Sequence, residues 1–213
     1  VDKIRLGMTQ TALVLILKFN LCLPEERTAI ADKLEELIHE FGNRMSTGFV
    51  GTPHILHVLT ECGKINLAYE LLFQDKNPSW LYSVDHGATT MWEHWNGIKE
   101  DGSFWADDMN SFNHYAYGAV GDWLYGVCAG IMPCKDGPGY KKFMLCPHPN
   151  EKLGFVNCSI KTDRGKIESN WYYKNNMIYF EFSIPQESRA TIILPNGFKK
   201  DVGSGKYMYC CKK

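Results

Sequence analysis

The spacing of the apolar residues changes near Pro133, and this change constrains the fold more than any other feature of the sequence. Upstream, apolar residues recur every three or four positions, as they do on one face of an α-helix. Downstream of the proline- and glycine-rich stretch at residues 133–149, they alternate with polar residues, as they do in β-strands. The sequence therefore predicts a mainly α-helical domain over residues 1–135 and a small, all-β antiparallel domain over residues 136–213.

Four helices are predicted in the first part of the chain. They cover residues 9–19, 24–41, 53–62 and 65–73. The second begins with Pro24 and two acidic residues and ends before Gly42. Short connections between such helices are typical of antiparallel helical hairpins. A long irregular segment at residues 74–112, interrupted by a short helix at 89–95, and a long helix at 113–131 are expected next.

The β-domain is predicted from strict alternation. In residues 178–184 the apolar positions are Ile178, Phe180, Phe182 and Ile184. Residues 175–176, both asparagine, are expected to form a turn that connects this strand to one at residues 167–171. Residues 191–194 are expected to form a further strand before the turn at 195–197.

The net charge and the cysteine pattern narrow the range of expected partners and compartments. A formal net charge of −1 leaves no basic surface, so neither nucleic acid nor a membrane is an expected partner. The eight cysteines contain no C-x-x-C pair, which favours unpaired thiols and a cytoplasmic setting over disulfides in a secreted protein.

The N-terminal residues loosely resemble a signal peptide, because Lys3 and Arg5 precede an apolar run at residues 12–17. Lys18 interrupts that run and no small-residue cleavage site follows, so a buried helix is expected instead. The run is also too short to span a bilayer. Because the chain begins almost within a helix, we expect it to be part of a longer protein.

The candidate chemistry lies in the aromatic-rich stretch at residues 80–114. Glu93 lies between Trp92 and Trp95, and a carboxylate that aromatic rings partly shield from water suits general acid or base catalysis. His114 could bond a sugar hydroxyl, and Asp85 with His86 forms a polar turn. From the residues alone, an exposed glutamate and a locally packed histidine are the favoured interpretations.

Other chemistries find little support in the sequence. It contains no G-x-S-x-G motif and no phosphate-binding glycine loop. His54 and His57 could present two metal ligands on one helix face, but no third ligand is near in sequence. The acidic pair Asp107 and Asp108 is typical of a solvated loop. No metal or other cofactor is therefore expected.

Five ordered segments carry a family resemblance. They are residues 46–53 (STGFVGTP), 67–72 (LAYELL), 78–82 (PSWLY), 87–93 (GATTMWE) and 109–116 (MNSFNHYA). Together they resemble the C-terminal part of bacterial-type α-L-rhamnosidases, glycoside hydrolase family seventy-eight. The β-domain is similar to the closing β-sandwich of that family.

The resemblance implies a partial (α/α)6 toroid followed by a β-sandwich. It also implies hydrolysis of terminal α-L-rhamnose, from a glycoside or polysaccharide, with inversion at the anomeric carbon. Glu93 then corresponds to the general base and His114 to a residue that contacts rhamnose, with Trp80 and Trp92 in the substrate site. The general acid of the family lies upstream of the segments matched here, so the chain is expected to lack it.

Two other functions remain open at this point. A different exo-glycosidase or a lyase on a similar helical toroid would use the same carboxylate and aromatic residues. Alternatively, without a general acid the chain could be a non-catalytic fragment or a sugar-binding module. The oligomeric state is not predicted.

Overall fold

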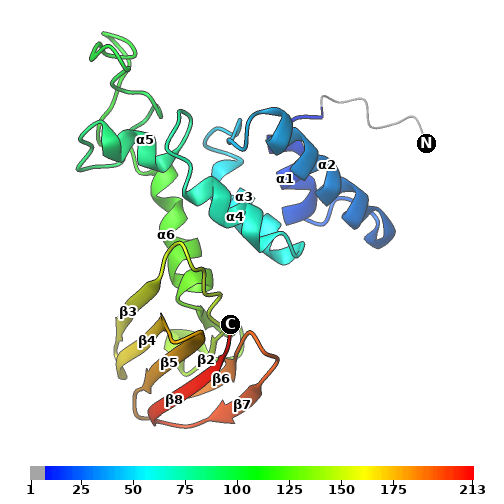
Figure 1. Ribbon diagram of the computed structural model, residues 1–213, viewed down its shortest axis with the longest axis vertical. Helices are drawn as coiled ribbons and strands as arrows, with labels where there is room; N and C mark the ends of the chain where they lie inside the picture. Colours follow the sequence, from blue (N-terminus) through cyan, green and yellow to red (C-terminus); the bar gives the residue numbers. More distant parts are fainter. Residues whose placement is uncertain (1–7) are drawn as a thin grey trace. The chain divides into compact units, whose positions relative to one another are not determined.

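The computed structural model describes residues 8–213, so Lys3 and Arg5 of the N-terminal segment lie outside the described residues. The chain divides into two compact units, the first ending at Val120 and the second spanning Gly121–Lys213 (Figure 1). The first unit is helical and the second carries the β-strands. In the described part of the chain, no helix combines the length and apolar character that a membrane crossing requires.

The helices of the first unit pack as antiparallel pairs. They are α1 (Gln10–Lys18), η1 (Pro24–Glu26), α2 (Arg27–Glu40), α3 (Thr52–Glu61), α4 (Ile65–Leu72) and α5 (Trp80–Asp85). α1 packs on α2 and α3 packs on α4, as expected for helical hairpins. The hydroxyl of Thr9 accepts a hydrogen bond from the Ala12 N–H and caps α1. The four helices predicted upstream of residue 74 are confirmed.

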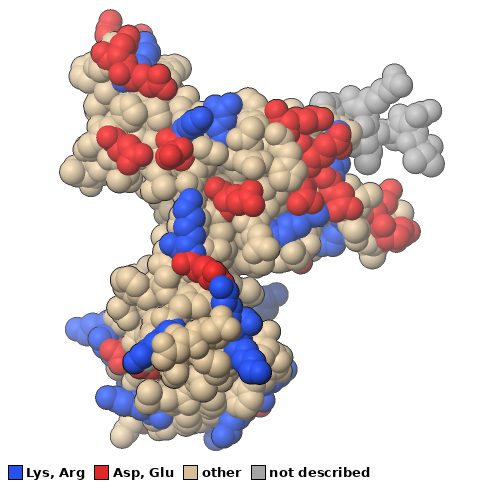
Figure 2. Space-filling model, viewed as in Figure 1, with Lys and Arg blue, Asp and Glu red and all other residues tan. Residues whose placement is uncertain are grey.

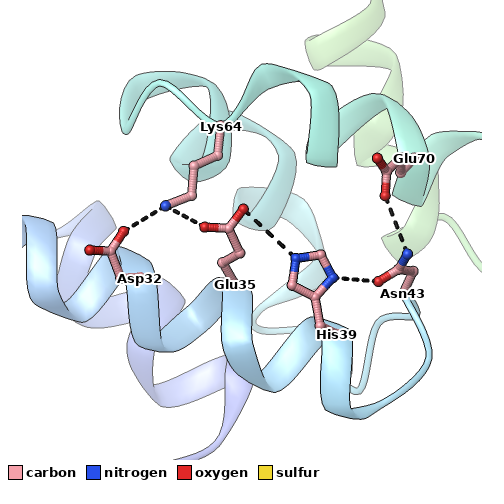
Figure 3. Close-up of polar contacts among 6 residues, drawn as sticks. All are labelled: Asp32, Glu35, His39, Asn43, Lys64 and Glu70. Atoms are coloured by element: carbon pink, nitrogen blue, oxygen red, sulfur yellow. Dashed lines mark hydrogen bonds and ion pairs between the residues drawn. The ribbon is translucent and has the colours of Figure 1, made fainter.

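A polar network joins α2 to the α3–α4 hairpin (Figure 3). Its members are Asp32, Glu35, His39, Asn43, Lys64 and Glu70. The Lys64 ammonium donates to Asp32 Oδ1 at 2.6 Å and to Glu35 Oε2 at 2.5 Å. These two hydrogen bonds raise the pKa of Lys64 above its usual value. Because the network connects elements distant in sequence, it fixes the packing of the two hairpins more than it adds net stability.

One predicted helix is wrong, and another is shorter than predicted. Residues 89–95 are not helical, because their backbone groups bond to residues 111–114 instead of to each other. The long helix at 113–131 is shorter than expected. It consists of η2 (Ala116–Ala119), α6 (Val120–Trp123) and the π-helical η3 (Leu124–Cys128). The His114 N–H bonds to the Met91 carbonyl, and Gly130 at φ +76° ends the helical path.

The second unit contains two four-stranded sheets. One has the order β1 (Ile131–Pro133), β2 (Lys142–Leu145), β6 (Arg189–Ile193), β7 (Lys199–Val202). The other has the order β3 (Phe155–Thr162), β4 (Gly165–Lys174), β5 (Met177–Ile184), β8 (Gly205–Lys212), and η4 (Pro138–Tyr140) lies between β1 and β2. All pairs are antiparallel except β2 with β6, which is parallel.

The alternating pattern correctly predicted two strands of the second sheet, β4 and β5, and the turn between them. Asn175 and Asn176 both adopt left-handed backbone angles, φ +50° and +61°, and connect β4 to β5 as a two-residue turn. Trp171 and Phe180 face each other across these strands and are fully buried. The Trp171 indole N–H donates to the Cys128 carbonyl at 2.7 Å, which fastens this sheet to the end of η3.

Acidic and basic side chains are distributed differently over the two units. On the face shown in Figure 2, Asp and Glu side chains gather over the helical unit, while Lys and Arg are scattered over the β unit. No continuous basic area covers this face, which agrees with the net charge of −1. None of the eight cysteines forms a disulfide.

Candidate functional site

Two backbone segments run beside each other and form the framework of the site. The Glu93 N–H donates to the Ser111 carbonyl at 2.8 Å, and the His114 N–H donates to the Met91 carbonyl at 2.9 Å. Farther along, the Trp105 N–H bonds to the Gly97 carbonyl at 3.1 Å. These bonds bring the segments at residues 87–93 and 109–116 together, so Glu93 and His114 lie on neighbouring segments.

The Glu93 carboxylate is held by the backbone opposite it. Its Oε2 accepts a hydrogen bond from the Ser111 N–H at 2.9 Å. Together with the bond from the Glu93 N–H, this makes a reciprocal pair that fixes both main chain and side chain. Within residues 8–213, no other hydrogen bond or ion pair engages the half-buried carboxylate. Its second oxygen can therefore accept a proton from a bound molecule.

The His114 imidazole is oriented by its own backbone and by aromatic rings. Its Nδ1 accepts a hydrogen bond from the Ala116 N–H at 3.3 Å. In the neutral ring the proton is then on Nε2, which becomes a hydrogen-bond donor. The Phe49 ring stacks on the imidazole at 4.5 Å between centroids, with 11° between the planes. His114 therefore presents one defined donor.

A groove of about 890 Å³ lies beside His114. It is lined by Phe49, Pro53, Met91, His114, Tyr115, Ala116, Gly118 and Ala119. The lining is mostly apolar with a few polar groups, which is the usual character of a small-molecule site. Glu93 does not line the groove, but Met91, two residues before it in the same segment, does. The Tyr115 side chain is 89 % exposed at its edge.

Trp80 and Trp92 are both buried, with 7 % and 4 % of their surface exposed. The Trp80 indole N–H donates to the Tyr117 carbonyl at 2.9 Å, and its ring meets Trp95 edge-on. Trp92 packs edge-on against Phe112. Both rings therefore support the backbone of the site from within the fold.

The other histidines considered as site residues make local structural contacts. His86 Nδ1 lies 2.8 Å from the Tyr82 carbonyl, and its ring stacks on Tyr82 at the end of α5. His54 and His57 lie on α3, where burial lowers the pKa of His54. Among the described residues, no group of three or more His, Cys, Asp or Glu side chains could hold a metal ion.

Three contributors were not predicted from the sequence. Phe49 lies in the segment at residues 46–53, where no feature of the sequence indicated that its ring stacks on His114. Tyr117 stacks on Trp95 at 3.8 Å with 13° between the planes. Ser111 acts through its main chain, so its residue type carries no signal.

Known families match both units. The bacterial alpha-L-rhamnosidase 6 hairpin glycosidase domain matches residues 4–128, and the bacterial alpha-L-rhamnosidase C-terminal domain matches residues 130–208. An alpha-L-rhamnosidase of Streptomyces avermitilis is 41 % identical over 189 residues, which cover 89 % of this chain and 18 % of that protein. One of Formosa agariphila is 41 % identical over 187 residues, covering 88 % of this chain and 20 % of that protein.

Solved structures agree with these matches. The Streptomyces avermitilis alpha-L-rhamnosidase complexed with L-rhamnose superposes with a TM-score of 0.92 at 36 % identity, over 97 % of this chain and 22 % of that one. The native enzyme from Aspergillus terreus gives a TM-score of 0.92 at 35 % identity, over 97 % and 24 %. The chain thus spans about a fifth of the length of the curated relatives it matches.

Proposed function

Because this chain belongs to the bacterial α-L-rhamnosidase family, we propose that it supplies the general-base side of an active site that hydrolyses terminal α-L-rhamnosides with inversion. Glu93 is the base and takes a proton from water. His114 binds the rhamnosyl unit through Nε2. Trp80 and Trp92 belong to the same site and act by holding its backbone in place.

The reciprocal hydrogen bonding between Glu93 and Ser111 is the observation that carries this proposal. It fixes one carboxylate oxygen and leaves the other to accept a proton. An inverting glycosidase needs such a carboxylate on one face of the sugar, with a water molecule between them. The hydrogen-bonded pair Glu93–Ser111 is followed along the same two segments by the pair Met91–His114. The base and the sugar-binding group therefore share one backbone framework.

A second carboxyl group is needed to protonate the leaving oxygen, roughly 6.5–9.5 Å from the base in inverting enzymes. In the described part of the chain, no carboxylate lines the groove beside His114. Because the chain spans about a fifth of the length of its curated relatives, we propose that residues outside these 213 provide the general acid. The groove itself suits a 6-deoxy sugar, because its apolar lining can pack against a methyl group while His114 bonds a hydroxyl.

A panel of aryl glycosides tests this function. The complete gene product that carries this chain is expected to hydrolyse an aryl α-L-rhamnoside and to leave aryl α-L-mannoside, β-D-glucoside and α-L-fucoside intact. Preferential hydrolysis of another sugar would assign a different exo-glycosidase. Rhamnose binding by calorimetry without hydrolysis would instead assign a sugar-binding module.

A further inference from the structure

The two units carry net charges of opposite sign. The first contains 16 Asp and Glu residues against 9 Lys and Arg, and the second contains 14 Lys and Arg against 8 Asp and Glu. The two excesses nearly cancel in the net charge of −1. The basic side chains of the second unit are scattered (Figure 2), so they favour the approach of negatively charged ligands without forming one basic patch.

A cavity of about 560 Å³ opens on the second unit, at one end of the sheet that contains β2, β6 and β7. The starts of β2 and β6 meet the end of β7 there, because β6 is parallel to β2 and antiparallel to β7. Its volume falls in the range of about 300–1,000 Å³ that is usual for small-molecule sites. The cavity is lined by Cys134, Asp136, Lys142, Phe143, Arg189, Ala190, Thr191, Asp201, Val202 and Gly203.

Polar side chains of this cavity share one face of the sheet. Arg189 is the register partner of Lys142, and Thr191 is the register partner of Asp201. Arg189 and Thr191 are two positions apart on β6, so their side chains point to the same side, whereas Ala190 between them is buried in the core. The outer face of the sheet therefore presents two cations, a hydroxyl and a carboxylate next to each other.

Arg189 is the charged group of the cavity that remains free for a ligand. The Lys142 ammonium donates to Asp136 Oδ2 at 2.6 Å, and the Thr191 hydroxyl donates to Asp201 Oδ1 at 2.6 Å. Within residues 8–213, no hydrogen bond or ion pair engages the exposed Arg189 guanidinium. The cavity thus offers one unpaired guanidinium together with two carboxylates that can accept further hydrogen bonds.

This combination matches a sugar that carries a single carboxylate. A guanidinium binds a carboxylate through two parallel N–H···O hydrogen bonds, which gives both charge and geometric complementarity. The carboxylates of Asp136 and Asp201 suit the hydroxyl groups of a sugar, which donate hydrogen bonds. The same carboxylates repel a phosphate ester, which carries more negative charge than a carboxylate.

We propose that this cavity binds a uronate unit of an acidic polysaccharide, with Arg189 on the uronate carboxylate and Asp136 and Asp201 on sugar hydroxyls. Together with the proposed function, this makes an acidic polysaccharide with terminal α-L-rhamnose the substrate class. A second contact with the same polymer raises the effective concentration of its chain ends around the protein. The substrate class rests on the proposed function, whereas binding in the cavity does not.

Calorimetry with an oligogalacturonate tests the site, because this probe contains uronate and no rhamnose. The complete gene product is expected to bind it, and to bind the carboxyl-reduced oligosaccharide and a sulfated neutral oligosaccharide of the same length much more weakly. Absence of oligogalacturonate binding would overturn the proposal. Equal binding of the carboxyl-reduced probe would remove the role of the carboxylate, and equal binding of the sulfated probe would show attraction by charge alone. Either result would also overturn it.

Arg189→Ala is expected to weaken oligogalacturonate binding about 10- to 100-fold, the loss typical of hydrogen bonds to a charged group. Arg189→Lys keeps the charge and loses the paired donors, so it is expected to restore only part of the affinity. Arg164→Ala is the matched control. It removes an arginine of the same unit that pairs with Glu187 and does not line the cavity, and it is expected to bind like the parent protein.

Unchanged affinity in Arg189→Ala would overturn the proposal. So would a lowered melting temperature in that variant together with no binding by the parent, because another part of the complete protein would then occupy the cavity. Glu93→Gln is expected to bind the probe like the parent, so failure of Glu93 as the base is recognised separately. Loss of binding in Glu93→Gln would place the probe in the groove beside His114 and contradict the proposal.

Discussion

Glu93→Gln is expected to lower kcat of the complete gene product on an aryl α-L-rhamnoside by roughly 10²–10⁴-fold, the usual contribution of general acid–base catalysis. Glutamine has the same shape, and its carbonyl oxygen can still accept the hydrogen bond from the Ser111 N–H. The fold is therefore preserved, but the amide cannot take a proton from water. Steady-state kinetics with circular dichroism on the same samples measures both effects.

Glu100→Gln provides the matched control, because Glu100 is an exposed carboxylate on the same irregular segment. It is expected to retain the parent kcat. Near-normal turnover by Glu93→Gln would reject Glu93 as the base. A loss of secondary structure in that variant would show that the carboxylate is needed for folding instead.

Gly130→Ala is expected to destabilise the second unit by roughly 3–5 kcal/mol, the combined effect of a left-handed non-glycine residue and of overpacking. Gly130 has φ +76°, and a Cβ there would lie 2.1 Å from the Pro147 nitrogen and 2.2 Å from the Cys146 carbonyl carbon. The Gly130 carbonyl, just before β1, also accepts a hydrogen bond from the Cys146 N–H, just after β2, at 2.8 Å. Moving the two segments apart to relieve the clash would therefore break this hydrogen bond. Urea unfolding measures the loss.

Gly139→Ala separates the two causes. Gly139 also has a left-handed backbone, φ +62°, but a Cβ there would meet nothing within 4 Å. This variant is expected to lose only about 1–2 kcal/mol, the backbone strain alone. Equal losses at the two glycines would show that the contact with residues 146–147 contributes nothing.

The elements predicted correctly are those that local periodicity determines. The faces of α1 to α4 and the alternation in β4 and β5 record burial directly in the sequence. Residues 89–95 failed because their backbone partners lie about 20 residues away, and no local pattern shows that pairing. The parallel pairing of β2 with β6 likewise depends on contacts distant in sequence.

The site was predicted in part. The tryptophans around Glu93 indicated a shielded carboxylate, and the ordered segments linked it to His114. The orientation of each group depends on main-chain bonds, from Ser111 to Glu93 and from Ala116 to His114, which any residue type could make. The roles of Phe49 and Tyr117 could not be predicted, because their ring contacts join segments that are far apart in the sequence.

The anomeric form of the first sugar released tests the central claim most directly. Proton NMR of the complete gene product acting on an aryl α-L-rhamnoside would follow the anomeric signals before mutarotation. Water activated by Glu93 on the face opposite the leaving group predicts that β-L-rhamnose appears first. Initial release of α-L-rhamnose would mean retention, and would contradict a mechanism in which Glu93 activates water for direct displacement.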